Sequence, residues 1–266
     1  MKIGFIGGGN MAEAMLSAIL NRKLATADEI IVSDVDANKR LKLQQKYHIN
    51  VTGDNCQAVQ GREIIILAIK PQVLADVSNG LKGRLQRSQL LISILAGKSI
   101  STLGTSLDHR CIIRSMPNTP AQIGEGISVW TATPEVTAAQ KKWAASILGV
   151  MGTEIYADDE KYVDMATAVS GSGPAYVFLF IESMAAAAVK LGFTQEVAQN
   201  LVIQTLLGAG HLLQKSCKTP QELRRMVTSP GGTTAEAIAA FEKGGFGELV
   251  EKAVFAAYDK ARKLGG

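Results

Sequence analysis

Short apolar runs alternate with amphipathic stretches along the first part of the chain. The runs predict strands over residues 2–6, 29–33, 63–69, 89–94 and 111–115, with helices from Asn10, after Asp36 and after Pro71. Residues 64–67 and 90–92 are apolar without alternation, which is expected of strands that are buried on both faces. The alternation of strand and helix therefore predicts a mostly parallel sheet covered by helices.

The pattern changes near residue 158, where long segments rich in alanine and leucine replace the strands. Residues 126–131 and 153–156 are the last predicted strands, and we expect both at the edges of the sheet. Thr219, followed by Pro220 and Glu222, is typical of a helix start. These patterns predict an α/β domain over residues 1–157 and an all-α domain over residues 158–266.

The first strand leads directly into a glycine-rich turn. In the pattern G-x-G-x-x-A, Gly7 would allow the tight turn, Gly9 would let the backbone approach a pyrophosphate, and Ala12 would allow close helix packing. A flexible turn is the alternative, but the flanking strand and helix favour a Rossmann-type dinucleotide site. The predicted cofactor contacts here are Ile6, Gly7, Gly8, Gly9, Asn10, Met11 and Ala12.

Further cofactor contacts are expected where later strands end, because dinucleotides bind at the carboxyl edge of such sheets. They are Ser33, Asp34, Ala68, Ile69, Lys70, Pro71, Ala96 and Gly97. Asp34 alone would hold a ribose diol and favour NADH. Ser33, Asn38, Lys39 and Arg40 supply a hydroxyl, an amide and positive charge at the same turn, which suits a 2′-phosphate.

Composition and charge limit the classes of function that this chain can have. With 266 residues, 47% hydrophobic and 20% charged, the chain suits a well-packed protein of about two domains. The net charge of +4 is spread over both halves without a basic run, so we expect no nucleic-acid partner. The cysteines at positions 56, 111 and 217 are too far apart for a zinc site, so no metal site is predicted and mostly buried thiols are expected.

The N-terminal sequence predicts the cellular location of the protein. The first residues already form the predicted binding strand, without the pattern of a secretory leader, so a cytoplasmic location is expected. The longest uncharged segment, residues 197–214, contains Gln199, Asn200, Gln204 and His211, which lipid would tolerate poorly. We predict a buried or interfacial helix there and no membrane association.

Five motifs occur in a fixed order along the chain: FIGGGNMA at residues 5–12, AIKPQ at 68–72, MPNTP at 116–120, SGSGPAY at 170–176 and SPGGTT at 229–234. Together they resemble the pyrroline-5-carboxylate reductases over essentially the whole chain. The resemblance implies NAD(P)H-dependent reduction of 1-pyrroline-5-carboxylate to L-proline, the last step of proline biosynthesis. It also implies a C-terminal dimerisation domain, with homodimers that can assemble into rings such as a decamer.

The last motif offers a cradle for a small carboxylate. It opens a predicted helix with free backbone N–H groups and hydroxyls, and the predicted substrate contacts are Ser229, Pro230, Gly231, Gly232, Thr233 and Thr234. Thr233 is also predicted to cap the helix with Glu236, and Thr234 to face the substrate or its ring nitrogen as the catalytic residue. The resemblance adds Asn118, Ser170 and Gly171 near the nicotinamide, Asn55 near the adenosine, and NADPH as the preferred cofactor with NADH also accepted.

The side chains favour imine reduction over alcohol oxidation. A hydroxy-acid dehydrogenase needs a base, and the related enzymes carry a lysine in the helix that their glycine-rich motif opens. Here residues 170–174 lead into residues 175–180, which contain no lysine. His48, His109 and His211 have sequence surroundings that suggest structural roles. Two alternatives stay open: a reductase of another imine or keto acid with the same architecture, and a non-catalytic dinucleotide sensor.

Overall fold

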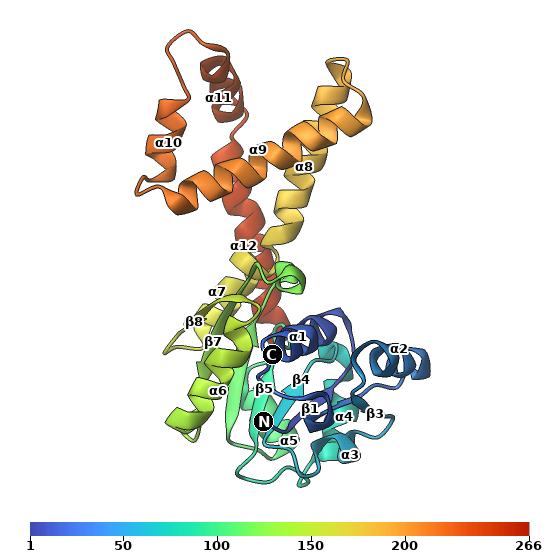
Figure 1. The fold of residues 1–266 in the computed structure, drawn as a ribbon. Coiled ribbons are helices and arrows are strands. Elements are labelled where there is room, and N and C mark those ends of the chain that lie inside the picture. Colours follow the sequence, from blue (N-terminus) through green and yellow to red (C-terminus); the bar gives the residue numbers. More distant parts are fainter. Residues whose placement is uncertain (266) are drawn as a thin grey trace. The chain divides into compact units, whose positions relative to one another are not determined.

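The computed structural model describes residues 1–265, which form two compact units (Figure 1). The first unit contains Met1–Pro174 together with the chain from Ala256 onward, and the second contains Ala175–Phe255.

An eight-stranded sheet is the centre of the first unit, in the order β3-β2-β1-β4-β5-β6-β7-β8. All neighbouring strands are parallel except β6 and β7. The strands are β1 (Ile3–Ile6), β2 (Ile30–Ser33), β3 (Asn50–Thr52), β4 (Ile64–Leu67), β5 (Leu90–Ser93), β6 (Ile112–Met116), β7 (Gly126–Ala132) and β8 (Gly152–Tyr156). The predicted mostly parallel sheet is confirmed.

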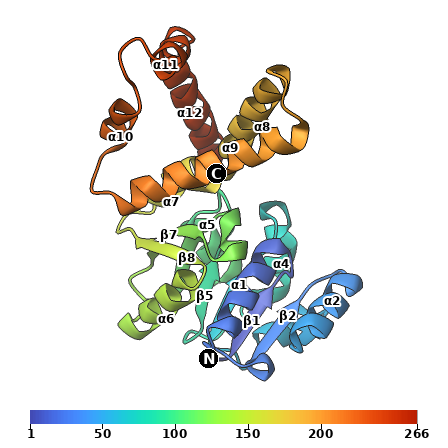
Figure 2. The ribbon, with the colours of Figure 1, turned by 45° about the horizontal axis from the view of Figure 1, so that its top comes forward.

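Helices cover both faces of the sheet and make two apolar cores (Figures 1 and 2). In β4, Ile64 and Ile66 pack into one core and Ile65 and Leu67 into the other, because successive side chains point to opposite faces. The first core is covered by α1 (Asn10–Asn21), α2 (Ala37–Tyr47) and α6 (Ala138–Gly149), and the second by α3 (Asn55–Val59), α4 (Leu74–Leu81) and α5 (Ile100–Leu107). Short 3-10 turns are Ala27–Glu29, Pro71–Val73 and Thr119–Ile123.

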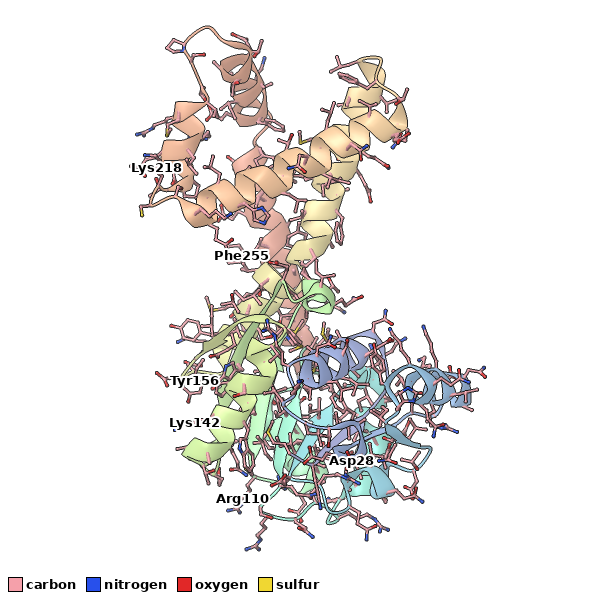
Figure 3. All side chains as sticks on the ribbon, viewed as in Figure 1. Asp28, Arg110, Lys142, Tyr156, Lys218 and Phe255 are labelled. Carbon is pink, nitrogen blue, oxygen red and sulfur yellow. The ribbon has the colours of Figure 1, made fainter. Side chains whose placement is uncertain are left out.

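Two details differ from the sequence-based expectation. The strand predicted over residues 126–131 is not at an edge, because β7 runs antiparallel beside β6 and also pairs with β8. The edges are β8, which carries Tyr156 (labelled in Figure 3), and the three-residue β3, which the apolar pattern did not indicate because its residues are exposed or half-buried.

Beyond Tyr156 the described residues contain helices and turns only, so the all-helical C-terminal part is confirmed. The elements are α7 (Lys161–Ala166), a π-helical turn (Thr167–Gly171), α8 (Gly173–Lys190), α9 (Gln195–Lys215), α10 (Pro220–Met226), α11 (Thr233–Lys243) and α12 (Phe246–Gly265). The predicted helix start at Thr219 is present, and its hydroxyl accepts a hydrogen bond from the Glu222 N–H at 3.3 Å.

The second unit exposes many large apolar side chains in the single chain. Leu179, Leu207 and Leu249 are each more than half exposed, whereas the buried apolar residues of this unit are the small or medium-sized Ala185, Ala198 and Val202. The segment predicted as a buried or interfacial helix lies in α9 and is mostly exposed here. Apolar surface of this extent is typical of an interaction face.

Among residues 1–265, one stretch, Lys161–Lys190, is apolar and long enough to cross a membrane by length and composition. A single stretch of this kind is only a weak indication, and here it includes the π-helical turn between α7 and α8.

Candidate functional site

The glycine loop between β1 and α1 has the geometry that a pyrophosphate contact requires. Gly7 has φ of +98°, and a Cβ there would lie 2.6 Å from the Ala68 carbonyl oxygen. A Cβ on Gly9 would meet no atom within 4 Å, so the backbone there is open to a ligand. Gly9 is also the N-cap of α1, and no side chain caps the helix, which leaves backbone N–H groups for an anion.

Three predicted cofactor residues meet at the carboxyl end of β2. The Asp34 carboxylate accepts hydrogen bonds from the Gly8 N–H at 2.8 Å and the Asp36 N–H at 2.9 Å. The Ser33 hydroxyl donates to Asn55 Oδ1 at 2.7 Å, and Arg40 Nη1 donates to the Asp34 carbonyl oxygen at 2.7 Å. Asp34 therefore fastens the glycine loop to β2, a role that the sequence did not reveal.

The glycine loop is braced further by its own helix. The Glu13 carboxylate, in the first turn of α1, accepts hydrogen bonds from Lys46 Nζ at 2.7 Å and the Tyr47 hydroxyl at 3.0 Å, both at the end of α2. The Lys46 hydrogen bond holds the pKa of Glu13 below its ordinary value of 4.5. The same helix, α2, also carries Arg40, which donates to the Asp34 carbonyl oxygen in the turn after β2. α2 therefore links α1 to this turn and fixes the distance between them.

The predicted contacts after β4 and β5 lie at the same carboxyl edge of the sheet. The Ala68 N–H donates to the Ile6 carbonyl at 2.9 Å, and Lys70 is exposed just before the 3-10 turn that begins with Pro71. Gly97 has φ of +70°, and a Cβ there would lie 2.6 Å from the Leu264 Cβ. The last turn of α12 therefore packs against Gly97.

The structure also brings together the three predicted substrate residues of the first unit. Asn118, which follows β6 and is buried, donates from Nδ2 to the Ser170 carbonyl at 3.1 Å and accepts from the Ile127 N–H at 2.9 Å. Ser170 lies in the π-helical turn, a rare feature that often marks functional sites. A Cβ on Gly171 would lie 2.7 Å from Met116 Cε, so glycine allows β6 to approach the turn.

Arg114 on β6 is a buried charge that the sequence reasoning missed. It is 2% exposed, and its guanidinium contacts Glu160 at 2.7 Å and also pairs with Asp164. Glu160 accepts a further hydrogen bond from the Ile100 N–H at 2.8 Å, at the start of α5. The available signal was a single charged residue inside a predicted strand, residues 111–115, that begins with an apolar run.

The remaining predicted substrate residues lie in the second unit, in the turn that opens α11. Gly231 has φ of +70°, and the Gly232 N–H donates to the Ser229 carbonyl at 3.0 Å. The prediction that Thr233 caps the helix is wrong: Gly232 is the N-cap, Thr233 is the first helical residue, and no side chain caps the helix. Because no side chain caps the helix, its first N–H groups are left for a ligand, and Thr234 is half-buried beside them.

The histidine, cysteine and acidic side chains of residues 1–265 do not form a metal site. Among residues 1–265 no three His, Cys, Asp or Glu side chains cluster as a metal site would require. His109 is buried with Nε2 2.8 Å from the Gln89 carbonyl oxygen, and His48 ends α2 in a left-handed conformation. Cys111 is buried, whereas Cys217 is exposed, which corrects the expectation of mostly buried thiols.

Comparison with known families agrees with this arrangement. Residues 160–264 match the family described as pyrroline-5-carboxylate reductase dimerisation, and residues 2–97 match the family described as NADP oxidoreductase, coenzyme F420-dependent. The first match supports self-association of this chain through its C-terminal helices.

Relatives match over the full length. The chain is 40% identical to a pyrroline-5-carboxylate reductase of Pseudomonas aeruginosa, covering 99% of this chain and 96% of the relative. It is also 40% identical to the one of Synechocystis, covering 100% and 98%. A Plasmodium falciparum pyrroline carboxylate reductase crystallised with NADP bound superposes with a TM-score of 0.91 at 34% identity, covering 100% and 98% of the two chains. This chain belongs to the pyrroline-5-carboxylate reductase family.

Proposed function

We propose that this protein is an NAD(P)H-dependent oxidoreductase that reduces 1-pyrroline-5-carboxylate to L-proline, the last step of proline biosynthesis. The observation that carries the proposal is the open, uncapped glycine loop at the start of α1, in a chain of this family. Residues 175–180, at the start of the helix after the π-helical turn, contain no lysine, which supports imine reduction over alcohol oxidation, because hydride addition to an imine needs no strong base.

The cofactor would lie along the carboxyl edge of the sheet. The N–H groups around Gly9 would hold the pyrophosphate, and the cluster of Ser33, Asp34 and Asn55 would hold the adenosine ribose. Lys70 is exposed and would reach a phosphate. When bound, NADPH, or NADH as the second choice, supplies the hydride.

The substrate carboxylate would bind at the start of α11, where N–H groups and the hydroxyls of residues 229–234 are available. Thr234 would hydrogen-bond the substrate or its ring nitrogen. Asn118, Ser170 and Gly171, which lie together in the first unit, would contact the substrate near the nicotinamide. The hydride adds to the C=N carbon and a proton to the nitrogen, so the imine becomes the secondary amine of proline.

For the assembly, we propose a homodimer formed through the C-terminal helices, with residues 1–157 as the dinucleotide-binding domain and 158–266 as the substrate and dimerisation domain. The exposed apolar side chains of the second unit support such an interface. Rings of dimers such as a decamer would extend it. The enzyme would work in the cytoplasm without a nucleic-acid or membrane partner.

The test is turnover by the purified protein. With pyrroline-5-carboxylate and NADPH or NADH, we expect loss of reduced-nicotinamide absorbance together with an equal amount of proline. Proline must be measured directly, because oxidation of the cofactor alone would not identify the product. Cofactor binding without turnover would favour the reductase of another imine first, and then a sensor.

Asp34 gives a separate test of cofactor choice. Asp34→Asn removes the negative charge but keeps one oxygen for the Gly8 N–H. If the carboxylate faces the ribose, the ratio of kcat/KM with NADPH to that with NADH should rise about tenfold, since about 1.4 kcal/mol of repulsion at a 2′-phosphate is removed. The exposed Asp28 provides the matched control, Asp28→Asn. An unchanged ratio would place the Asp34 charge away from the ribose.

A further inference from the structure

We propose that Arg114 is a positioning residue for catalysis, which holds the turn of Ser170 and Gly171 in place through Glu160 and Asp164. The inference rests on the proposed reduction of pyrroline-5-carboxylate. It assigns a role to a buried charge that touches none of the predicted substrate or cofactor contacts through a hydrogen bond or ion pair within residues 1–265.

The first observation is how Arg114 joins the sheet to α7. Its two terminal nitrogens each meet one carboxylate, Glu160 at 2.7 Å and Asp164 one helical turn later. The side chain is 3% exposed, whereas the carboxylates are partly open to solvent. Arg114 Nε is buried without a partner within residues 1–265, so these two carboxylates carry its hydrogen bonding.

The second observation is that α7 runs directly into the π-helical turn. The turn is held on its far side by Asn118, whose Nδ2 donates to the Ser170 carbonyl, and by Met116 against Gly171. Met116 and Asn118 follow Arg114 by two and four residues on β6 and its extension. The end of β6 and the residues after it therefore contact both α7, through Arg114, and the π-helical turn that follows α7, through Met116 and Asn118.

The geometry requires arginine at this position. A guanidinium is a planar fork that can serve two carboxylates at once, whereas a lysine ammonium is a single point charge on a flexible stem. With lysine, one of the two carboxylates would lose its partner, and the two acidic groups would repel each other. We expect α7 to shift and the Ser170 carbonyl to move with it, and displacements of about 1 Å can lower kcat by about 100-fold.

The test compares Arg114→Lys with the wild-type protein. We expect kcat with pyrroline-5-carboxylate to fall about tenfold or more, while the Kd for NADPH stays within about twofold. Adding Asp164→Asn should restore a large part of kcat, because the single ammonium then faces one carboxylate. Hydrogen exchange should become faster at the amides of residues 167–172 and stay unchanged at residues 7–12. The control is Lys161→Ala, which breaks an exposed pair with Asp159 next to Glu160 on the chain.

Some outcomes would overturn the proposal. If Arg114→Lys keeps the wild-type kcat per folded molecule, the ion pairs of Arg114 serve stability alone, whatever the change in Tm. Equal losses in kcat and NADPH affinity would place the effect in the dinucleotide site. If Arg114→Lys does not fold, Glu160→Gln and Asp164→Asn test the same coupling, and full activity in both would refute it. If the wild-type protein shows no turnover, the proposed reaction is wrong. Independently of turnover, unchanged amide hydrogen exchange at residues 167–172 in Arg114→Lys would refute the coupling between Arg114 and the turn.

Discussion

Replacing Thr234 by alanine should reduce kcat/KM for pyrroline-5-carboxylate roughly 100-fold and leave the Kd for NADPH nearly unchanged. Thr234 is half-buried in the first turn of α11, beside N–H groups that no side chain caps. Loss of one hydrogen-bond donor at a developing charge typically costs roughly 100- to 1,000-fold in rate. Steady-state kinetics with varied imine, and fluorescence titration with NADPH, measure the two quantities separately.

The matched control for this experiment is Thr205→Ala in the same unit. Thr205 is exposed on α9, and its hydroxyl donates to the Leu201 carbonyl within its own helix at 2.7 Å. The same chemical change should therefore leave both kcat/KM and the Kd at the wild-type values. If Thr234→Ala weakened NADPH binding as much as it slowed imine reduction, Thr234 would not be a substrate contact.

Several features of the fold were predictable because their signals are local. The buried strands were recognised from uninterrupted apolar runs, and the loop from Gly7 to Gly9 was recognised because it follows a strand directly. The helix start at Thr219 was predicted from three residues within one turn. In each case the physical cause lies within a few positions of the residue it affects.

Other features depend on partners that are far apart in the sequence. Arg114 pairs with residues 46 and 50 positions later, so its strand pattern alone shows only an odd charge. The Asp34 carboxylate was predicted to face a ribose, and its hydrogen bond to Gly8, 26 positions away, became visible only in the folded chain. The Thr233 cap was wrong although its pattern is local, because Gly232 adopts the capping conformation one residue earlier.

Several helices were also missing from the sequence-based prediction. α3 has only five residues, and α5 contains a glycine at position 104 that weakens a helical pattern. α6 begins with a local signal that was readable, since the side chains of Thr137 and Gln140 form a capping box. The short α3 and the glycine-containing α5 thus have weak sequence patterns, whereas α6 was missed although its start is marked in the sequence.

Gly7→Ala should abolish tight cofactor binding, with the Kd for NADPH raised roughly 100-fold or more. Two effects add at this position. A left-handed backbone conformation costs a non-glycine residue about 1 kcal/mol or more, and the new Cβ would lie 2.6 Å from the Ala68 carbonyl oxygen. The loop must then move away from β4, which displaces the N–H groups that should hold the pyrophosphate.

Gly61→Ala separates these two effects. Gly61 also has a positive φ, +67°, but a Cβ there would meet no atom within 4 Å, and the residue lies before β4, at the amino edge of the sheet. It should lower the free energy of unfolding by about 1 kcal/mol, seen as a lower Tm, without changing the Kd for NADPH. If the Kd for NADPH changed equally in both variants, general destabilisation would explain the weaker NADPH binding. A change confined to Gly7→Ala would instead show that the close approach of the glycine loop to Ala68 fixes the position of the amides that we propose to bind the pyrophosphate.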